Sequence, residues 1–130
     1  MREAIDVAII KNGKILIVRK KLAWILPGGK PNSGESDIEC LCREVREELS
    51  GVGLENFKFY NIFEGVTPYK GDLLQAKVYF ADTKWDNYIP SAEIEEIGWA
   101  NEPEQYNFSD ITKKIIMSLC EDNYLRWKTQ

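Results

Sequence analysis

The sequence predicts a mixed α/β fold in which helices pack on a sheet whose strands are mostly joined by hairpins. Two observations carry this prediction. Short apolar runs separated by turn residues recur along the chain, and two segments, 36–49 and 109–120, have apolar residues at helical spacing. The chain has 130 residues and is 44% hydrophobic, which is enough for one packed core. We therefore expect residues 1–130 to form a single domain.

The first 29 residues are expected to form strands and turns. Residues 7–10 are apolar and favour a strand, and residues 15–18 favour the strand that returns beside it. The turn between them contains Asn12-Gly13, a pair suited to the positive φ angles of a type I′ hairpin turn. Residues 24–26 are again apolar, and we interpret the following Pro-Gly-Gly at 27–29 as a loop.

A helix is predicted over residues 36–49. Ser36 and Glu39 stand three apart as in a capping box, which satisfies two backbone N–H groups at a helix start. The apolar positions follow the i, i+3, i+4, i+7 spacing of a helix with one buried face: Ile38, Leu41, Cys42, Val45 and Leu49. Gly51 is suited to end this helix.

The second half of the sequence predicts three strands and a second helix. Strands over 57–63 and 73–80 flank a loop of residues 64–72, and acidic residues precede a short strand over 94–99. The second helix covers residues 109–120, with Ser109 as its N-cap. Apolar residues after this helix are expected to hold the tail against the rest of the protein.

Composition argues against several classes of function. The net charge of −4 disfavours a broad nucleic-acid-binding face, so nucleic acid is not the expected partner. No apolar run approaches the roughly 20 residues of a membrane span, and the three cysteines do not suggest a disulfide scaffold. A cytoplasmic location is therefore expected. Because histidine is absent, acid–base and metal chemistry falls to carboxylates, backbone oxygens, Tyr or Lys.

One edge of the first helix is acidic. Glu44, Glu47 and Glu48 fall within an arc of about 100° that lies beside the apolar stripe rather than opposite it. Like charges four apart destabilise a helix by about 0.2–0.5 kcal/mol per pair. Judged by the helix alone, a solvated face held by ion pairs of Arg43 with Glu39 and Glu47 is the commoner explanation.

The segment before the helix changes that interpretation. Seven residues stand at a fixed spacing between the Gly-Gly turn and the helix end: Gly29, Glu35, Arg43, Glu44, Val45, Glu47 and Glu48. This spacing resembles the Nudix box, the signature of the Nudix hydrolases, which include the MutT-type proteins. All six fixed positions of the box up to the last glutamate match, and so does the first aliphatic position. Trp-x-x-Pro-Gly-Gly before the box, and Glu-x-Glu-Glu-x-x-Trp near the end of the chain, follow the order seen in small Nudix domains.

The resemblance implies a fold and a metal site. Nudix domains are α/β/α sandwiches with a mixed sheet and two main helices. They hydrolyse a nucleoside diphosphate linked to another group, with a divalent metal, usually Mg²⁺ and possibly Mn²⁺, between phosphates and protein. By the match, Glu47 and Glu48 would be metal ligands, Glu44 would ligate metal or act as general base, and the Gly28 carbonyl would be a further ligand. A later acidic residue often joins such a site, and Glu93 is our candidate.

The same match implies residues that bind substrate or brace the site. Arg19 ends the second predicted strand, where relatives often place a base that contacts phosphate, although an exposed strand end is an equally ordinary explanation. Gly29, the first residue of the box, is expected to lie against the substrate. Arg43 and Glu35 would form a salt bridge that holds the loop against the helix.

The sequence departs from the family pattern at the end of the box. Ser50 stands where the family has glycine, and Gly51 stands where it has an aliphatic residue. Since that glycine would serve as a left-handed helix cap, we predict that the helix ends one residue later, with Gly51 as the cap and Val52 in the aliphatic role.

The sequence is consistent with three functions. The favoured reaction converts a nucleoside triphosphate to monophosphate and pyrophosphate, because a compact chain is typical of that type. The second is hydrolysis of ADP-ribose or a nucleotide sugar, which a proline some way past the box, here Pro68, weakly favours. The third is a Nudix module that binds nucleotide without cleaving it, and such modules usually lose box carboxylates. Monomer and homodimer are both left open.

Overall fold

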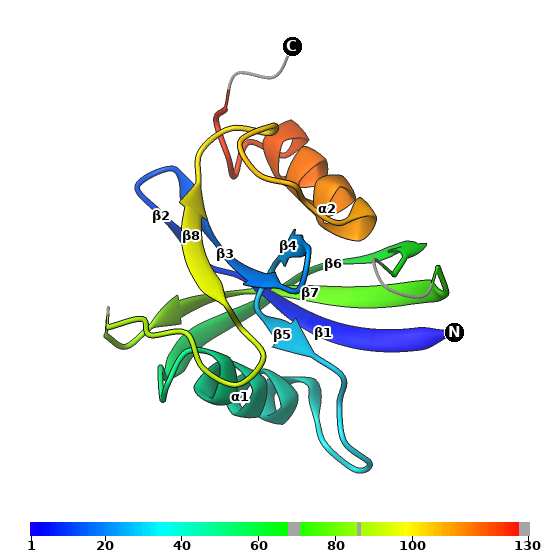
Figure 1. The fold of residues 1–130 in the computed structure, drawn as a ribbon, viewed down its shortest axis with the longest axis vertical. Helices are drawn as coiled ribbons and strands as arrows, with labels where there is room; N and C mark the ends of the chain where they lie inside the picture. The colour runs from blue at the N-terminus through cyan, green and yellow to red at the C-terminus, as the bar shows by residue number, and fades with distance from the viewer. Residues whose placement is uncertain (68–70, 86, 128–130) are drawn as a thin grey trace.

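The computed structural model describes residues 1–67, 71–85 and 87–127, so Pro68 lies outside the described residues. Within these residues the strands form two sheets of four strands each (Figure 1). The first, sheet A, runs in the order β5 (Gly28–Gly29), β1 (Arg2–Ala8), β7 (Leu73–Thr83), β6 (Leu54–Val66). β1 and β7 are parallel while the other pairs are antiparallel, so sheet A is mixed, as predicted.

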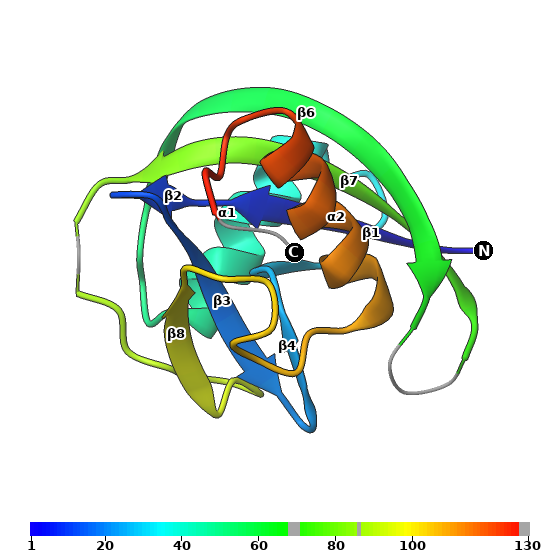
Figure 2. The same ribbon diagram turned by 90° about the horizontal axis from the view of Figure 1, so that it is seen from above.

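The second sheet, sheet B, is built around β3 (Lys14–Lys20). This strand pairs antiparallel with β2 (Ile10–Lys11), β4 (Ala23–Ile25) and β8 (Glu96–Ala100). Asn12 and Gly13 have φ angles of 52° and 76° in the turn between β2 and β3, which confirms the expected hairpin. Figure 2 shows β6 and β7 as a long curved pair at the outer side of the molecule.

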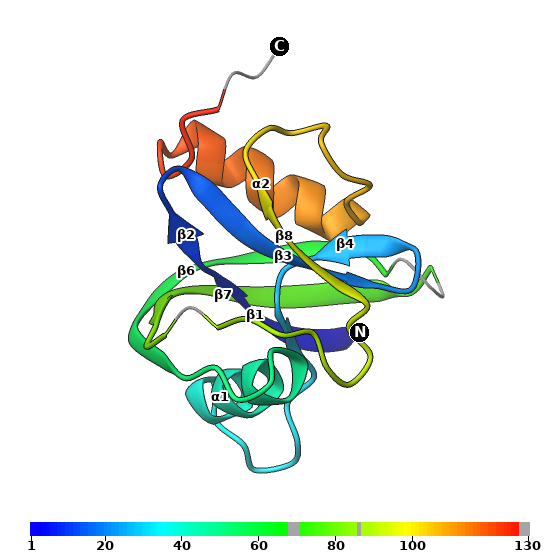
Figure 3. The ribbon, with the colours of Figure 1, turned by 60° about the vertical axis from the view of Figure 1, so that its left-hand side comes forward.

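The two sheets lie between two helices. Figure 3 shows α1 (Asp37–Glu48) below the sheets and α2 (Asp110–Glu121) above them, which confirms the α/β/α arrangement for the described residues. Leu41 and Val45 of α1 pack in one buried cluster with Ile5 and Val7 of β1. A second cluster joins α2 to β7 and to β3. Neither helix in the described part of the chain is long and apolar enough to cross a membrane.

The strand expected over residues 7–10 is divided between the two sheets. β1 ends at Ala8 in sheet A, and β2 begins at Ile10 in sheet B. Ile9 lies between them, 1% exposed, and its carbonyl accepts a hydrogen bond from the Leu16 amide at 2.9 Å. The apolar run is therefore continuous because both strands and their junction are buried, not because one strand spans it.

The Pro-Gly-Gly segment is more ordered than the predicted loop. Gly28 and Gly29 form β5, which pairs with Asp6 and Ile5 of β1 at the edge of sheet A. Gly28 has a φ of 144°, and a Cβ on it would lie 2.1 Å from the Ile5 carbonyl oxygen. Only glycine allows the two backbones to approach this closely. The interpretation of residues 27–29 as a loop was therefore wrong for the two glycines.

The predicted first helix is confirmed, but its end was placed wrongly. Ser36 is the N-cap, and both hydrogen bonds of the capping box with Glu39 are present. α1 ends at Glu48, and Ser50 itself takes the left-handed conformation, with a φ of 52°. The Gly51 amide donates to the Arg46 carbonyl at 2.8 Å, which makes a Schellman end with serine in the glycine position. The helix therefore does not run on to Gly51.

Candidate metal and diphosphate site

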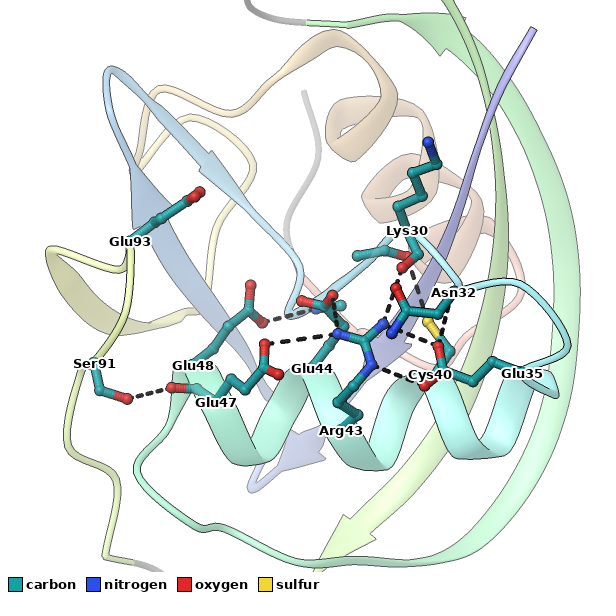
Figure 4. Close-up of polar contacts among 12 residues, drawn as sticks. Lys30, Asn32, Glu35, Cys40, Arg43, Glu44, Glu47, Glu48, Ser91 and Glu93 are labelled. Carbon is teal, nitrogen blue, oxygen red and sulfur yellow. Dashed lines mark hydrogen bonds and ion pairs between the residues drawn. The ribbon is translucent and has the colours of Figure 1, made fainter.

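Three predicted site residues line one edge of α1, facing β5. Figure 4 shows Glu44, Glu47 and Glu48 along the same side of the helix. Glu48 is 6% exposed, and its Oε1 accepts a hydrogen bond from the Gly28 amide at 3.0 Å. Burial raises the pKa of Glu48 to about 8, and the charges of Glu44 and Asp6 act in the same direction. This carboxyl is held against β5 in an environment that disfavours its charge.

Glu44 lies against the other glycine of β5. A Cβ built on Gly29 would come within 2.5–2.8 Å of the Glu44 carboxyl group, so the site requires glycine here. The buried Cys40 thiol donates to the Gly29 carbonyl at 3.6 Å and has a pKa raised to about 12, chiefly by burial, as expected for a packing cysteine. Gly29, which was predicted to bind substrate, therefore lies in β5 in close contact with Glu44 of α1.

Arg43 and Glu35 form the predicted brace. The Arg43 guanidinium donates from Nε and Nη2 to both Glu35 oxygens at 2.8 and 2.9 Å, and from Nη2 to the Lys30 carbonyl at 3.0 Å. Its Nη1 donates to Glu44 Oε1 at 2.7 Å. The hydrogen bonds from Arg43 lower the pKa of Glu35 to about 2. A bidentate pair therefore fixes the loop before the helix and also holds Glu44.

Glu47 is the most open of the three glutamates. Its side chain is 55% exposed, and Oε2 lies 3.6 Å from Arg43 Nη1. Its backbone carbonyl accepts a hydrogen bond from the Ser91 hydroxyl, and the Ser91 amide donates to the Glu48 carbonyl at 3.0 Å. The loop around Ser91 is thereby attached to the C-terminal end of α1.

Two predicted residues are engaged elsewhere in the structure. Glu93, with a side chain 71% exposed, pairs with Lys20 at 2.7 Å, and that contact lowers its pKa. In Figure 4 it stands apart from the glutamates of α1. Arg19 pairs with Glu95 and Glu96 at 2.6 and 2.7 Å, bonds that raise its pKa. Both roles stay predictions, and each would need an existing ion pair to be exchanged for a new partner.

A cleft opens beside the two glycines of β5. Its volume is about 760 Å³, within the range of pockets that bind nucleotide-sized ligands. Lys20, Lys21 and Lys30 line it, together with Asp6 and Glu93. The cleft therefore combines lysine charge suited to phosphate with the carboxylates of Asp6 and Glu93.

Asp6 lies next to Gly28 and lines the cleft, and the sequence interpretation did not include it. It stands opposite Gly28 in the β1–β5 pairing, and a Cβ on Gly28 would lie 2.7 Å from Asp6 Oδ1. Burial, with the charge of Glu44, raises the pKa of Asp6 to about 7. The available signal was a single charged residue inside the apolar run from Ala4 to Ile10, which is unusual for a buried strand.

The donor chemistry of this edge fits a hard divalent cation. Glu44, Glu47, Glu48 and the Gly28 carbonyl offer oxygen only, which Mg²⁺ and Mn²⁺ prefer. The pKa values of Glu48 and Asp6 are raised, and a cation bound in the site would lower them by stabilising the ionised carboxylates. In residues 1–67, 71–85 and 87–127, no three acidic, histidine or cysteine side chains converge as a finished metal cage.

Comparison with known proteins decides the family. The model of the NUDIX domain family matches residues 1–117. This chain belongs to the Nudix family. Members of this family typically act on pyrophosphate bonds and use a divalent metal. The resemblance seen in the box spacing is thereby confirmed, and every box carboxylate is in place.

Relatives of this Nudix protein differ in what they act on. The mRNA-decapping protein g5R of African swine fever virus (isolate Warthog/Namibia/Wart80/1980) is 33% identical over 95 residues, 62% of this chain and 37% of the viral protein. The match thus spans little more than a third of that curated relative. A MutT NUDIX hydrolase from Burkholderia pseudomallei superposes with a TM-score of 0.73 at 24% identity, over 89% of this chain and 95% of that one.

A second similar structure contains a metal. It is a bifunctional NMN adenylyltransferase/ADP ribose pyrophosphatase from Francisella tularensis, complexed with AMP and a Mn ion. Its TM-score is 0.71 at 18% identity, and the match covers 93% of this chain and 41% of that one. At these identities the structural likeness establishes the Nudix fold.

Proposed function

We propose that this Nudix hydrolase cleaves a nucleoside triphosphate to monophosphate and pyrophosphate, with Mg²⁺ as its metal and Mn²⁺ as a substitute. The observation that supports this most directly is the contact of the α1 glutamates with β5 at the wall of a lysine-lined cleft. A triphosphate needs positive charge along its length and a cation at the bond that breaks. Lysines line the cleft, and the α1 glutamates proposed to hold the cation contact β5, whose two glycines also line it.

Each box residue has a role in this proposal. Glu47, Glu48 and the Gly28 carbonyl hold the metal, which lowers the pKa of bound water and offsets phosphate charge when it is present. Glu44 ligates metal or removes the proton from the attacking water, and Arg43 positions it through the 2.7 Å hydrogen bond. Gly29 leaves the space that Glu44 occupies. Lys20, Lys21 and Lys30 stand along the cleft to meet the remaining phosphates.

A substrate panel tests the proposal. Purified protein is incubated with nucleoside triphosphates, ADP-ribose, UDP-sugars and capped RNA in the presence of Mg²⁺ or Mn²⁺, and the products are identified by chromatography and mass. We expect pyrophosphate and monophosphate from a triphosphate, with no turnover in chelator. Preferential release of AMP and ribose phosphate from ADP-ribose would instead support the second function.

Capped RNA is a second candidate because of one finding. The viral decapping protein is 33% identical over 95 residues, which cover 62% of this chain, yet the net charge of −4 opposes a long RNA contact. A short cap analogue tests recognition of the cap alone, whereas a capped RNA of about 30 nucleotides also tests the effect of the negative net charge on RNA binding. If the RNA is cleaved and the triphosphates are not, the triphosphate proposal is overturned.

Other features expected from the sequence stay predictions. These are the single domain over residues 1–130, the cytoplasmic location, and the monomeric or homodimeric state. Gel filtration with light scattering measures the last of these directly.

A further inference from the structure

Asp6 lies closer to the glycine strand than the acidic residue predicted for the metal site. The β1–β5 register places Asp6 opposite Gly28, and its Oδ1 would be 2.7 Å from a Cβ on that glycine. Gly28 also donates its amide to Glu48. Asp6 and Glu48 therefore both border the residue whose carbonyl is a proposed metal ligand.

The partners of the two acidic candidates differ. Glu93 is exposed and already neutralised by Lys20 at 2.7 Å. The half-buried Asp6 carboxyl makes no hydrogen bond or ion pair with any residue in the described ranges 1–67, 71–85 and 87–127. The charge that acts on it is that of Glu44, which is repulsive. A carboxyl that faces a cleft beside two further carboxyl groups and has no cationic partner is suited to a divalent cation.

The strand context gives Asp6 no packing reason to be acidic. It sits between Ile5 and Val7, which are 2% and 0% exposed and belong to the core beneath α1. Asp6 faces away from that core and lines the cleft with Gly28 and Gly29. An apolar or small residue would satisfy the strand at least as well.

We propose that Asp6 is an additional carboxylate of the divalent-cation centre, contributed by β1 from outside the Nudix box, and that it takes the place predicted for Glu93. The inference rests on the proposed function, because it assumes that the cation is held between α1 and β5. Its oxygen approaches beside Gly28, where it either meets the cation or accepts a hydrogen bond from a water that the cation retains.

The test measures metal binding apart from turnover. Mn²⁺ binding to wild type, Asp6→Asn and Glu55→Gln is followed by electron paramagnetic resonance without nucleotide, and the thermal midpoint is recorded in chelator. We expect Asp6→Asn to weaken Mn²⁺ binding about tenfold or more. We also expect its metal-free midpoint to stay level or rise, because a repelled charge is removed. Glu55→Gln, which removes an exposed charge from β6, should match wild type in both measurements.

Two outcomes overturn the inference. One is an unchanged Mn²⁺ affinity in Asp6→Asn, and the other is a metal-free midpoint that falls together with the affinity, which would indicate a structural role. A measurement on the wild-type protein covers the case of a variant that does not fold. In protein carrying ¹³C carboxyl labels, Mg²⁺ should shift the Asp6 and Glu48 signals with the same midpoint, and an unmoved Asp6 signal contradicts the inference.

Glu48→Gln separates this inference from the proposed function. If Glu48→Gln binds Mn²⁺ and turns over nucleotide as wild type does, the metal assignment to α1 fails as a whole. If Glu48→Gln loses both while Asp6→Asn keeps both, only the role of Asp6 fails.

Discussion

The two ends of α1 are built on opposite principles. At the N-terminal end, Ser36 and Glu39 close a capping box, and Glu35 has two hydrogen bonds from Arg43 that lower its pKa to about 2. At the C-terminal end, Glu48 is buried with its pKa raised to about 8, and Ser50 holds a left-handed backbone. The same type of side chain is stabilised as an anion at one end and disfavoured as an anion at the other.

This difference indicates that the two ends of α1 have different roles. The N-terminal end is satisfied by its own partners and fixes where the helix stands. The C-terminal end carries unfavourable charge that a divalent cation would relieve, so its energy is coupled to binding. Four changes test this contrast, from the largest expected effect to the smallest.

Glu48→Gln should lower turnover by about 100-fold or more. Removing a metal ligand costs several kcal/mol of transition-state stabilisation, and each 1.36 kcal/mol is a factor of ten in rate. The metal-free protein should not lose stability, because the variant keeps the shape of a buried group while removing its charge. Steady-state rates at saturating Mg²⁺ and thermal melts in chelator measure the two effects. Activity near that of wild type contradicts the role given to Glu48.

Arg43→Lys should reduce activity about 10- to 100-fold while preserving charge. Lysine cannot reproduce the bidentate contact with Glu35 together with the hydrogen bond to Glu44, and residues that orient metal ligands have effects of this size. Arg46→Lys, at an exposed position one turn away, is the matched control and should behave as wild type. Equal rates in the two variants would show that charge alone suffices at position 43.

The metal-free protein should become less stable as pH rises from about 5 to 8. Between the ordinary pKa of 4.5 and the native pKa of about 8, the folded state holds a proton on Glu48 that the unfolded state has lost, so stability falls with pH. Glu35 acts oppositely. Its lowered pKa contributes stability above 4.5 that is lost as pH falls toward 2.

Thermal melts in chelator, from about pH 4.5 to 8.5, measure this dependence. The midpoint should be highest near pH 5, and saturating Mg²⁺ should abolish the decline toward pH 8, because the cation favours ionised carboxylates. Glu48→Gln should have a flatter profile in chelator. A midpoint that rises through this window in wild type would mean that Glu48 is not disfavoured as an anion.

Ser50→Gly should stabilise the protein by about 1 kcal/mol and leave the rate unchanged. A serine in the left-handed region is strained, and glycine adopts it freely. Ser36→Ala is the counterpart at the other end and should destabilise by about 1 kcal/mol through loss of the N-cap. Denaturant unfolding of both variants completes the comparison. Destabilisation by Ser50→Gly would indicate that the serine hydroxyl has a role of its own.

Local patterns predicted much of the fold. The capping box and apolar stripe of α1, the Asn12-Gly13 turn and the Ser109 N-cap are each decided by a few neighbouring residues, and each is present. The resemblance to the Nudix box implied the Arg43–Glu35 brace, which is also present. These features depend on short-range sequence, where propensity and hydrogen-bonding chemistry are sufficient guides.

Features that depend on distant partners could not be predicted in this way. The pairing of Gly28 and Gly29 with β1 is decided by a close approach of two backbones. The split of the first apolar run at Ile9 depends on which sheet each half joins. The surroundings of Asp6 and Glu93 also depend on tertiary contacts. Asp6 lies against Gly28 of β5, whereas Glu93 pairs with Lys20. Sequence spacing holds no information about these distances.

The Val7 amide donates a hydrogen bond to the Pro27 carbonyl at 2.9 Å, and this bond reports whether β5 is attached to β1. β5 has only two residues and lies at the edge of sheet A, so it should detach from β1 at a lower free energy than the core requires for unfolding. Detachment carries away Gly28 and with it the proposed metal contact. Hydrogen exchange at the Val7 amide therefore reports how often the enzyme visits an inactive form while the rest of the molecule is still folded.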